Sequence, residues 1–337
     1  MTKRKSIAAK LGLAIVLVVS LTILLGAVRS AKTPNETPTA GGLVNTEQAG
    51  GSKVYFTADI SSRGILAVYN ALQNSIGVPV SGKVAIKLHM GEPGNQNYLR
   101  PELLRDLVST VNGSFVDGNT AYGGRRGSTQ SHLQAAKDHG FTYAPVDILD
   151  EDGEIRLPIR GGKHATEALL GSHILNYDWI LSVAHFKGHS MAGYGGTFKN
   201  LAIGIATPAG KRAIHSNPGG AMFSSSGEPF FEKVIEYNMA LMLAKPGRML
   251  YINVLNNLSI NCDCDARAPK ADMPDIGILA SLDPVALDKA SLDLVYARPA
   301  EERRSLVERI ESRNGAYQVI YAEKMGLGSQ VYELVRL

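Results

Sequence analysis

From Lys53 to the end of the chain, short apolar segments typical of β-strands alternate with longer segments in which apolar residues recur at helical spacing. This alternation is the feature that most constrains the fold, because strands separated by helices usually form parallel sheets covered on both faces. We therefore predict an α/β domain with a mostly parallel open sheet and helices on both faces. The predicted strands are 53–57, 84–89, 114–117, 178–184, 249–254 and 276–280. The predicted helices are 62–75, 101–111, 128–139, 228–243, 284–296 and 300–312.

An uncharged apolar segment extends from Leu11 to Val28, close to the N-terminus. Its length approaches the ~20 residues that cross a bilayer, and four basic residues precede it in the segment 1–10. This charge bias predicts a cytoplasmic N-terminus and a single-pass membrane protein whose C-terminal domain is extracytoplasmic. A cleaved signal peptide, which would give a secreted protein, and a buried core helix are the alternatives. Residues 29–52 are rich in Thr, Pro, Gly and Asn, which predicts a flexible linker before one domain at 53–337.

The charge balance bears on the class of partner. The formal net charge is +4, and four basic residues lie in the first ten positions, so the rest of the chain is close to neutral. A neutral body gives no electrostatic reason to bind nucleic acid. We instead expect the membrane, a small anionic ligand and a redox protein as candidate partners.

The second predicted strand ends in a cluster of polar residues. Lys87 and His89 lie two residues apart, so on a strand their side chains share one face, and Glu92 follows closely. Because ligands bind beyond the carboxyl ends of parallel strands, Lys87 and His89 are candidate catalytic residues and Glu92 a candidate binding residue. The alternative is a half-exposed strand at the edge of the sheet.

A glycine-rich segment follows the third predicted strand and precedes a helix. Glycines allow the backbone to approach a ligand closely, and a helix N-terminus favours anions. Four polar residues here are candidate ligand-binding residues: Asp117, Asn119, Arg125 and Arg126. The alternative is an ordinary turn. His132 and His139, on the helix, are expected at the surface or at a helix end.

The segment after the strand 178–184 contains the highest density of candidate catalytic and ligand-binding residues. Two histidines and two lysines lie within fifteen residues among four glycines, which packing alone does not explain. Histidines serve as acid–base groups or metal ligands, and lysines bind anions. The candidate catalytic residues are His185, Lys187 and His189, and the candidate binding residues are Lys199 and Asn200.

The chain has two cysteines, Cys262 and Cys264, separated by one residue. Two thiols could hold a soft or borderline metal ion if a histidine converged on them. The possible partners are His185, His189 and His215. The alternative is a pair of buried free cysteines. The flanking Asp263 and Asp265 argue against deep burial.

Asp283 precedes Pro284 at the start of a predicted helix, an arrangement typical of a helix N-cap. Asp288 lies more than one turn further along this helix. Both are candidate ligand-binding residues at the mouth of the same site.

The order of these motifs resembles the domain of unknown function 362 family. The matching motifs are Lys-Leu-His-x-Gly-Glu, Asp-Gly-Asn-Thr, His-Phe-Lys-Gly-His, Gly-Gly-x-x-Lys-Asn-Leu, Cys-Asp-Cys and Asp-Pro-Val-Ala-Leu-Asp, and the resemblance extends from about Val54 to the C-terminus. It implies an uncharacterised, often iron–sulfur associated protein. The ferredoxin-type insert of many members would fall between His215 and Glu232, where this chain has no cysteine. A ferredoxin-type cluster is therefore not expected from this chain alone, whereas a metal ion is possible.

Two functions are compatible with these patterns. The first is an enzyme or redox-linked protein that uses a metal ion or another cofactor in a cleft of His, Lys and Cys residues. The alternative is a non-catalytic protein that captures an anionic small molecule. The two differ in whether the thiols are needed.

Overall fold

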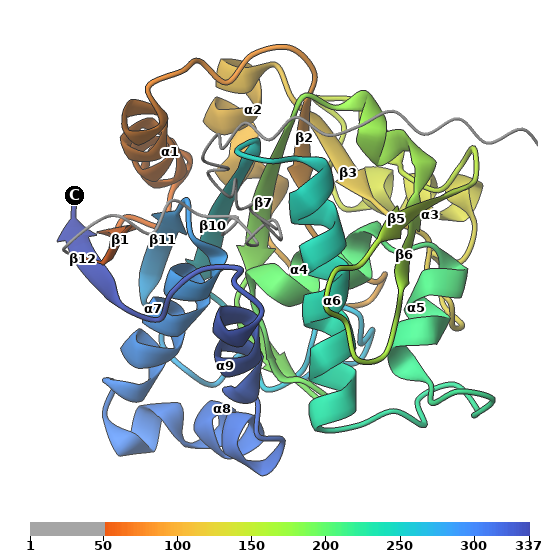
Figure 1. The fold of residues 1–337 in the computed structure, drawn as a ribbon. Helices are drawn as coiled ribbons and strands as arrows, with labels where there is room; N and C mark the ends of the chain where they lie inside the picture. Colours follow the sequence, from red (N-terminus) through yellow and green to blue (C-terminus); the bar gives the residue numbers. More distant parts are fainter. Residues whose placement is uncertain (1–50) are drawn as a thin grey trace, which may run out of the picture. The chain divides into compact units, whose positions relative to one another are not determined.

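The structure is a computed structural model that describes residues 51–337 (Figure 1). Eight strands form one sheet in the order β12-β1-β11-β10-β7-β2-β3-β4. Their bounds are Ser52–Thr57 (β1), Val84–Lys87 (β2), Ser114–Asp117 (β3), Val146–Ile148 (β4), Trp179–His185 (β7), Met249–Leu255 (β10), Gly277–Ser281 (β11) and Tyr332–Arg336 (β12). Only the two pairings made by β11 are antiparallel. The predicted open, mostly parallel sheet is therefore confirmed.

Helices cover both faces of the sheet, as predicted (Figure 1). Neighbouring strand residues point to opposite faces, so Ala85 joins one buried cluster and Ile86 the other. The face of Ile86 packs against α1 (Ser62–Ile76), α2 (Arg105–Val111) and α3 (Thr129–Asp138). The face of Ala85 packs against α4 (Thr197–Ile205), α6 (Glu228–Ala244), α7 (Pro284–Tyr296) and α9 (Tyr317–Lys324).

The predicted strands and helices are all present, with ends that agree within two residues. The first part of the helix predicted from 101 is a 3₁₀ turn, η1 (Pro101–Leu104), and the last of the six is α8 (Ala300–Ser312). The structure adds short elements that the sequence pattern did not indicate. They include the hairpin of β5 (Glu154–Pro158) and β6 (Glu167–Gly171), the hairpin of β8 (Lys187–His189) and β9 (Gly193–Gly195), the turn η2 (Ser172–Asn176) and the helix α5 (Pro208–His215).

The predicted N-terminal segments 1–10, 11–28 and most of 29–52 lie outside the described residues, so the membrane anchor stays a prediction. At the end of the predicted linker, Ser52 already belongs to β1. Within residues 51–337, no helix is both long enough and apolar enough to span a bilayer.

Candidate functional site

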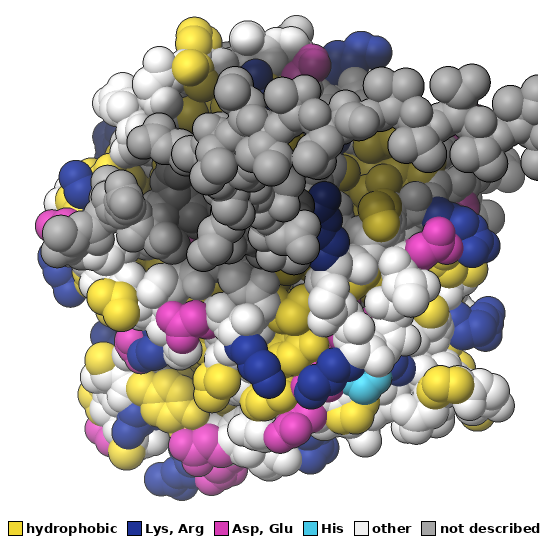
Figure 2. Space-filling model, in the orientation of Figure 1, with side chains coloured by type: hydrophobic (Ala, Val, Ile, Leu, Met, Phe, Trp, Pro, Cys, Tyr) yellow, Lys and Arg dark blue, Asp and Glu magenta, His cyan; other side chains and the backbone are white. Residues whose placement is uncertain are grey.

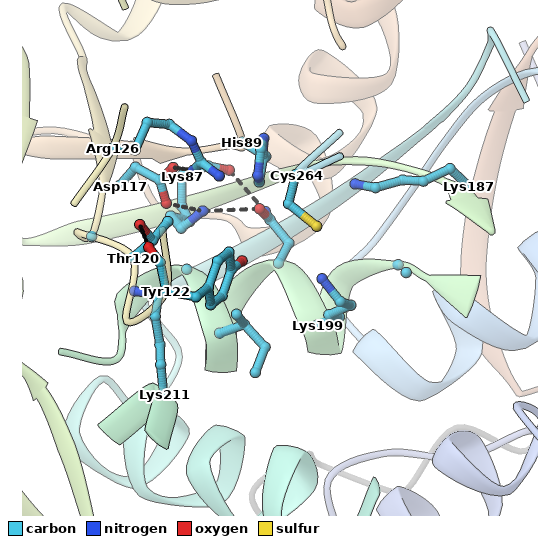
Figure 3. A pocket seen from close by; sticks show the side chains of 16 residues that line it. Lys87, His89, Asp117, Thr120, Tyr122, Arg126, Lys187, Lys199, Lys211 and Cys264 are labelled. Carbon is cyan, nitrogen blue, oxygen red and sulfur yellow. Dashed lines mark hydrogen bonds and ion pairs between the residues drawn. The ribbon is translucent and has the colours of Figure 1, made fainter. Parts of the chain in front are cut away.

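A narrow cavity lies at the carboxyl edge of the sheet, where β2, β3 and β7 end in parallel (Figure 3). The helix α4 forms another wall. Eight of the predicted site residues line it: Lys87, His89, Asp117, Arg126, Lys187, Lys199, Asn200 and Cys264. The alternative of an edge strand for β2 is wrong, because β2 lies between β7 and β3 and all four of its residues are buried.

Lys87 and Asp117 form a buried ion pair at the base of the cavity, with 3.1 Å between Lys87 Nζ and Asp117 Oδ1. Lys87 Nζ also donates to the carbonyl oxygen of Leu88 at 2.8 Å and to Asn200 Oδ1 at 3.0 Å. The amide of Asn200 in turn donates to the carbonyl of Lys87 and to the hydroxyl of Ser182. Asn200 thus ties α4 to the sheet, and the ammonium of Lys87 has all three of its donors engaged.

Glu92 fixes the glycine-rich loop over the cavity. Its carboxylate accepts hydrogen bonds from Arg126 Nε at 2.8 Å and from the backbone N–H of Arg125 at 2.7 Å. The two arginines predicted to bind a ligand therefore lie in different environments. Arg126 is buried in the cavity wall, whereas the side chain of Arg125 is exposed and pairs with Asp138. Asn119 is buried beside the cavity and donates to the hydroxyl of Thr129.

Asp263 is fully buried and joins two of the predicted residues. His185 Nδ1 lies 2.9 Å from its carboxylate, and Lys187 Nζ lies 3.1 Å from it. The sequence analysis predicted that the aspartates beside the cysteines would keep this segment from deep burial. This prediction is wrong for Asp263, because its two partners compensate for the cost of burying its carboxylate. Burial alone would raise the pKa of Asp263, but His185 and Lys187 outweigh it and hold the pKa well below the usual range. His185 also donates from Nε2 to the carbonyl of Asn256.

The two cysteines lie close to His189, one of the three histidines predicted as possible metal ligands. The ligand atoms of His189, Cys262 and Cys264 all lie within 4.8 Å of one another. The thiol of Cys264 donates a hydrogen bond to Cys262, and this bond is the main reason why the pKa of Cys262 lies well below its usual value. The positive charges of Lys199 and Lys187 lower this pKa further. Lys199 Nζ lies 3.7 Å from the sulfur of Cys262. This arrangement favours a thiolate on Cys262 and a thiol on Cys264, at the cavity wall.

The hydrogen bonds of His189 bear on metal binding. Its Nδ1 accepts from the backbone N–H groups of Met191 and Ala192, at 3.2 and 2.9 Å. Burial keeps the pKa of His189 well below its usual value, so the ring is neutral and carries its proton on Nε2. A metal-bound histidine usually donates its second ring N–H instead, so this geometry is not the common one. His89 is similar, because its Nδ1 accepts from the N–H of Gly91.

Two predicted binding residues lie away from the cavity wall. Asp283 is the N-cap of α7, accepts from the N–H of Val285 and also binds Ser329 near the C-terminus. Asp288 is buried behind α4 and accepts from the N–H of Thr197 at 2.9 Å. Burial raises the pKa of Asp288 to about 6. Both aspartates thus hold helices that shape the site.

His132 differs from expectation. It was expected at the surface or at a helix end, but it is fully buried on the inner face of α3, with Nε2 3.6 Å from Asp117 Oδ2. His139 is the C-cap residue of α3, as expected of a helix-end histidine.

Two residues of the candidate site were not indicated by the sequence pattern. They are Asp263, which lies between the two cysteines in the sequence, and Lys211 on α5. Lys211 is 2% exposed, and its side chain lines the cavity and extends toward the glycine-rich loop (Figure 3). Lys211 follows the Gly-Gly-x-x-Lys-Asn segment by eleven residues, a spacing that belongs to no recognisable motif, so the sequence contains no direct signal for it.

The family model described as "Domain of unknown function (DUF362)" matches residues 84–293, well over half of the chain. The chain belongs to this family. The predicted resemblance is thus confirmed, and the residues that line the cavity all lie within the part that matches the DUF362 family.

Two solved structures are similar to this member of the DUF362 family. The lactate racemase apoprotein from Thermoanaerobacterium thermosaccharolyticum is 18% identical, with a TM-score of 0.37, over 60% of this chain and 50% of that one. A protein from Thermotoga maritima is 9% identical, with a TM-score of 0.40, over 80% of this chain and 60% of that one. This chain therefore spans only about half to 60% of their lengths. No curated protein matches it.

Proposed function

We propose that this protein is an enzyme that binds a small organic anion, through a carboxylate or phosphate group, in the cavity at the carboxyl edge of the sheet. The supporting observation is a concentration of buried basic side chains around the cavity. The basic side chains that line the cavity are Lys87, Arg126, Lys187, Lys199 and Lys211. Three carboxylates face them, those of Asp117, Glu92 and Asp263.

Within residues 51–337, Lys199 and Lys211 form no ion pair with a carboxylate. An anionic ligand would give both amines the carboxylate or phosphate oxygen that they lack. Nη2 of Arg126 is also buried and without a hydrogen-bond partner among the described residues. On the face of the molecule in Figure 2, by contrast, acidic and basic side chains are interspersed.

Reactive groups beside the cavity favour an enzyme over a capture protein. Cys264 lines the cavity, and Lys199 contacts the sulfur of Cys262. The thiolate is the nucleophilic form of cysteine, and the lysine beside Cys262 favours that form, whereas simple capture of an anion needs no thiol. His89, neutral because burial keeps its pKa well below the usual value, is a further group that can move a proton at this wall.

Replacing Lys199 tests the proposal. We expect Lys199→Met to weaken the binding of inorganic phosphate or of a small carboxylate by roughly 10- to 100-fold, as measured by calorimetry on the whole chain in mild detergent. This range corresponds to the ~1.5–3 kcal/mol of a hydrogen bond to a charged group. Lys324→Met on α9 is the matched control, because Lys324 is exposed and should leave binding unchanged. Equal affinity in the wild type and in both variants would contradict the proposal.

A second candidate function is metal-assisted catalysis, which the convergence of His189, Cys262 and Cys264 favours. Two thiolates and one imidazole are a known ligand set of catalytic zinc sites, in which the fourth position stays open for substrate. Here Cys264 would place that position at the cavity. The proton on Nε2 of His189 and the nearby cations Lys187 and Lys199 weigh against a bound metal ion.

Metal content separates the two candidates. Metal-assisted catalysis predicts close to one metal ion per chain in protein purified without added metal or chelator, and its loss in Cys262→Ser and Cys264→Ser. Elemental analysis measures this directly. Ser259→Ala is a suitable control. Ser259 lies in the same segment as the cysteines but has a hydroxyl group instead of a thiol, so its replacement should leave the metal content unchanged. A metal-free wild type that still binds phosphate would exclude metal-assisted catalysis and support the binding of an organic anion.

A further inference from the structure

Lys211 is a buried lysine that enters the cavity from α5. The helix begins at Pro208 and is capped by Thr207, whose hydroxyl accepts from the N–H of Gly210. This start places Lys211 in the first turns of the helix. Its side chain extends toward the loop that holds Thr120 and Tyr122 (Figure 3).

Among the lysines that line the cavity, Lys211 is the one whose amino group contacts neither a carboxylate nor a thiol of the described residues. Lys87 and Lys187 are each paired with a carboxylate, and Lys199 contacts the sulfur of Cys262. Lys211 Nζ donates one hydrogen bond, to the carbonyl of Ala206. A Cβ atom added at Gly118 would lie 3.1 Å from Nζ, so the amine packs against a residue that has no side chain to cover it.

The surroundings of Lys211 also favour its neutral form. The pKa of Lys211 is lowered to about 7, chiefly by burial; Asp117 and Asp150 raise it, and Lys87 and Arg126 lower it. Near pH 7 a large fraction of the amine is therefore unprotonated. An unprotonated amine is the nucleophilic form of lysine, and burial next to other cations is one way in which enzymes obtain it.

We propose that Lys211 forms a Schiff base with the carbonyl carbon of a small oxo acid bound in the cavity. This inference rests on the proposed binding of anions, since Lys199 and Arg126 would hold the carboxylate. The lone pair of Nζ attacks the carbonyl carbon, a C–N bond forms, and a proton passes from nitrogen to the carbonyl oxygen to give a carbinolamine. Loss of water then gives the C=N bond. Water is the only leaving group, and no electrons are gained or lost overall.

Reductive trapping tests this step. The whole chain is incubated at pH 7 with glyoxylate, as the smallest oxo acid, and with sodium cyanoborohydride, whose hydride reduces a C=N bond to a stable secondary amine. Peptide mapping by mass spectrometry then locates the carboxymethyl group that results. We expect the modified fraction at Lys211 to exceed that at any other lysine by at least about tenfold, because an ordinary lysine has a pKa of about 10.4. Lys211→Arg should remove this adduct, whereas Lys324→Arg should leave it in place.

The outcomes are separable. Modification spread over exposed lysines, or concentrated at Lys187 or Lys199, would overturn the Schiff base. If the wild type binds phosphate but shows no adduct at Lys211, the Schiff base fails and the proposed anion site stands. If the wild type does not bind phosphate, the proposed function fails as well. The map of the wild type decides between these results even if Lys211→Arg folds poorly.

Discussion

Replacement of Asp263 by Asn is expected to lower the free energy of unfolding by about 3–5 kcal/mol, the cost of breaking a buried ion pair by removing one partner. The carboxylate of Asp263 is fully buried and accepts from both His185 and Lys187. An amide in its place offers one oxygen and turns its N–H₂ group toward a cation. Lys187 would then lack its carboxylate counter-charge, and His185 would lose its buried hydrogen-bond acceptor. Urea unfolding, followed by circular dichroism, measures the change.

Asp272→Asn is the matched control, because Asp272 is exposed and lies in the same long segment between β10 and β11. We expect it to change stability by less than about 0.5 kcal/mol. An equally small effect at Asp263 would show that the buried network does not stabilise the fold as described.

The effect of Asp263 should also depend on pH. The native pKa of Asp263 is depressed, so its carboxylate stabilises the fold above the unfolded value of about 3.9. That contribution is lost as pH falls toward the native pKa. The difference in stability between the wild type and Asp263→Asn should therefore stay constant from about pH 7 to about pH 5 and narrow below about pH 4. A difference that widened on acidification would contradict this assignment of charge.

Gly204→Ala is expected to destabilise the protein by about 2–4 kcal/mol, although alanine is the better helix former. A Cβ atom at Gly204 would lie 2.1 Å from Cε and Nζ of Lys87. The ammonium would have to move away from Asp117, Asn200 and the carbonyl of Leu88, all of which it contacts. Thermal and urea unfolding would measure the loss.

A double-mutant cycle identifies the cause. In a Lys87→Met background, Gly204→Ala should cost less than in the wild type, because the ion pair is already absent. Gly123→Ala is the control, since a Cβ there meets nothing within 4 Å. If Gly204→Ala costs the same in both backgrounds, contact with Lys87 is not the reason.

The sheet was predictable because its central strands are short, apolar and bounded by turn residues. The strand 114–117 coincides with β3, and 249–254 with all but the last residue of β10. The antiparallel direction of β11 could not be foreseen, because nothing in an apolar pattern encodes strand direction. α4 was also missed, because its Gly-Gly start and its polar Lys199 and Asn200 are typical of a loop. The structure shows that Asp288 takes the place of a capping residue for this helix.

The candidate site was predictable where its residues directly follow a strand. Lys87, Asp117 and Lys187 are examples, since topology alone brings the carboxyl ends of parallel strands together. Asp263 and Lys211 were not predictable, because their roles depend on loop and helix packing between distant segments. Asp283 and Asp288 show the converse: the N-cap predicted at Asp283 is confirmed, but neither carboxylate lines the cavity.

The central claim is that the cavity binds an anion, and a crystal structure of the whole chain grown with selenate tests it most directly. Anomalous scattering from selenium locates the anion, and the expected position is within hydrogen-bond distance of Lys199 Nζ and Arg126 Nη2. Crystals of Lys199→Met under the same conditions should lose that peak. Selenium found only on the protein surface, with the cavity filled by water alone, would contradict the account.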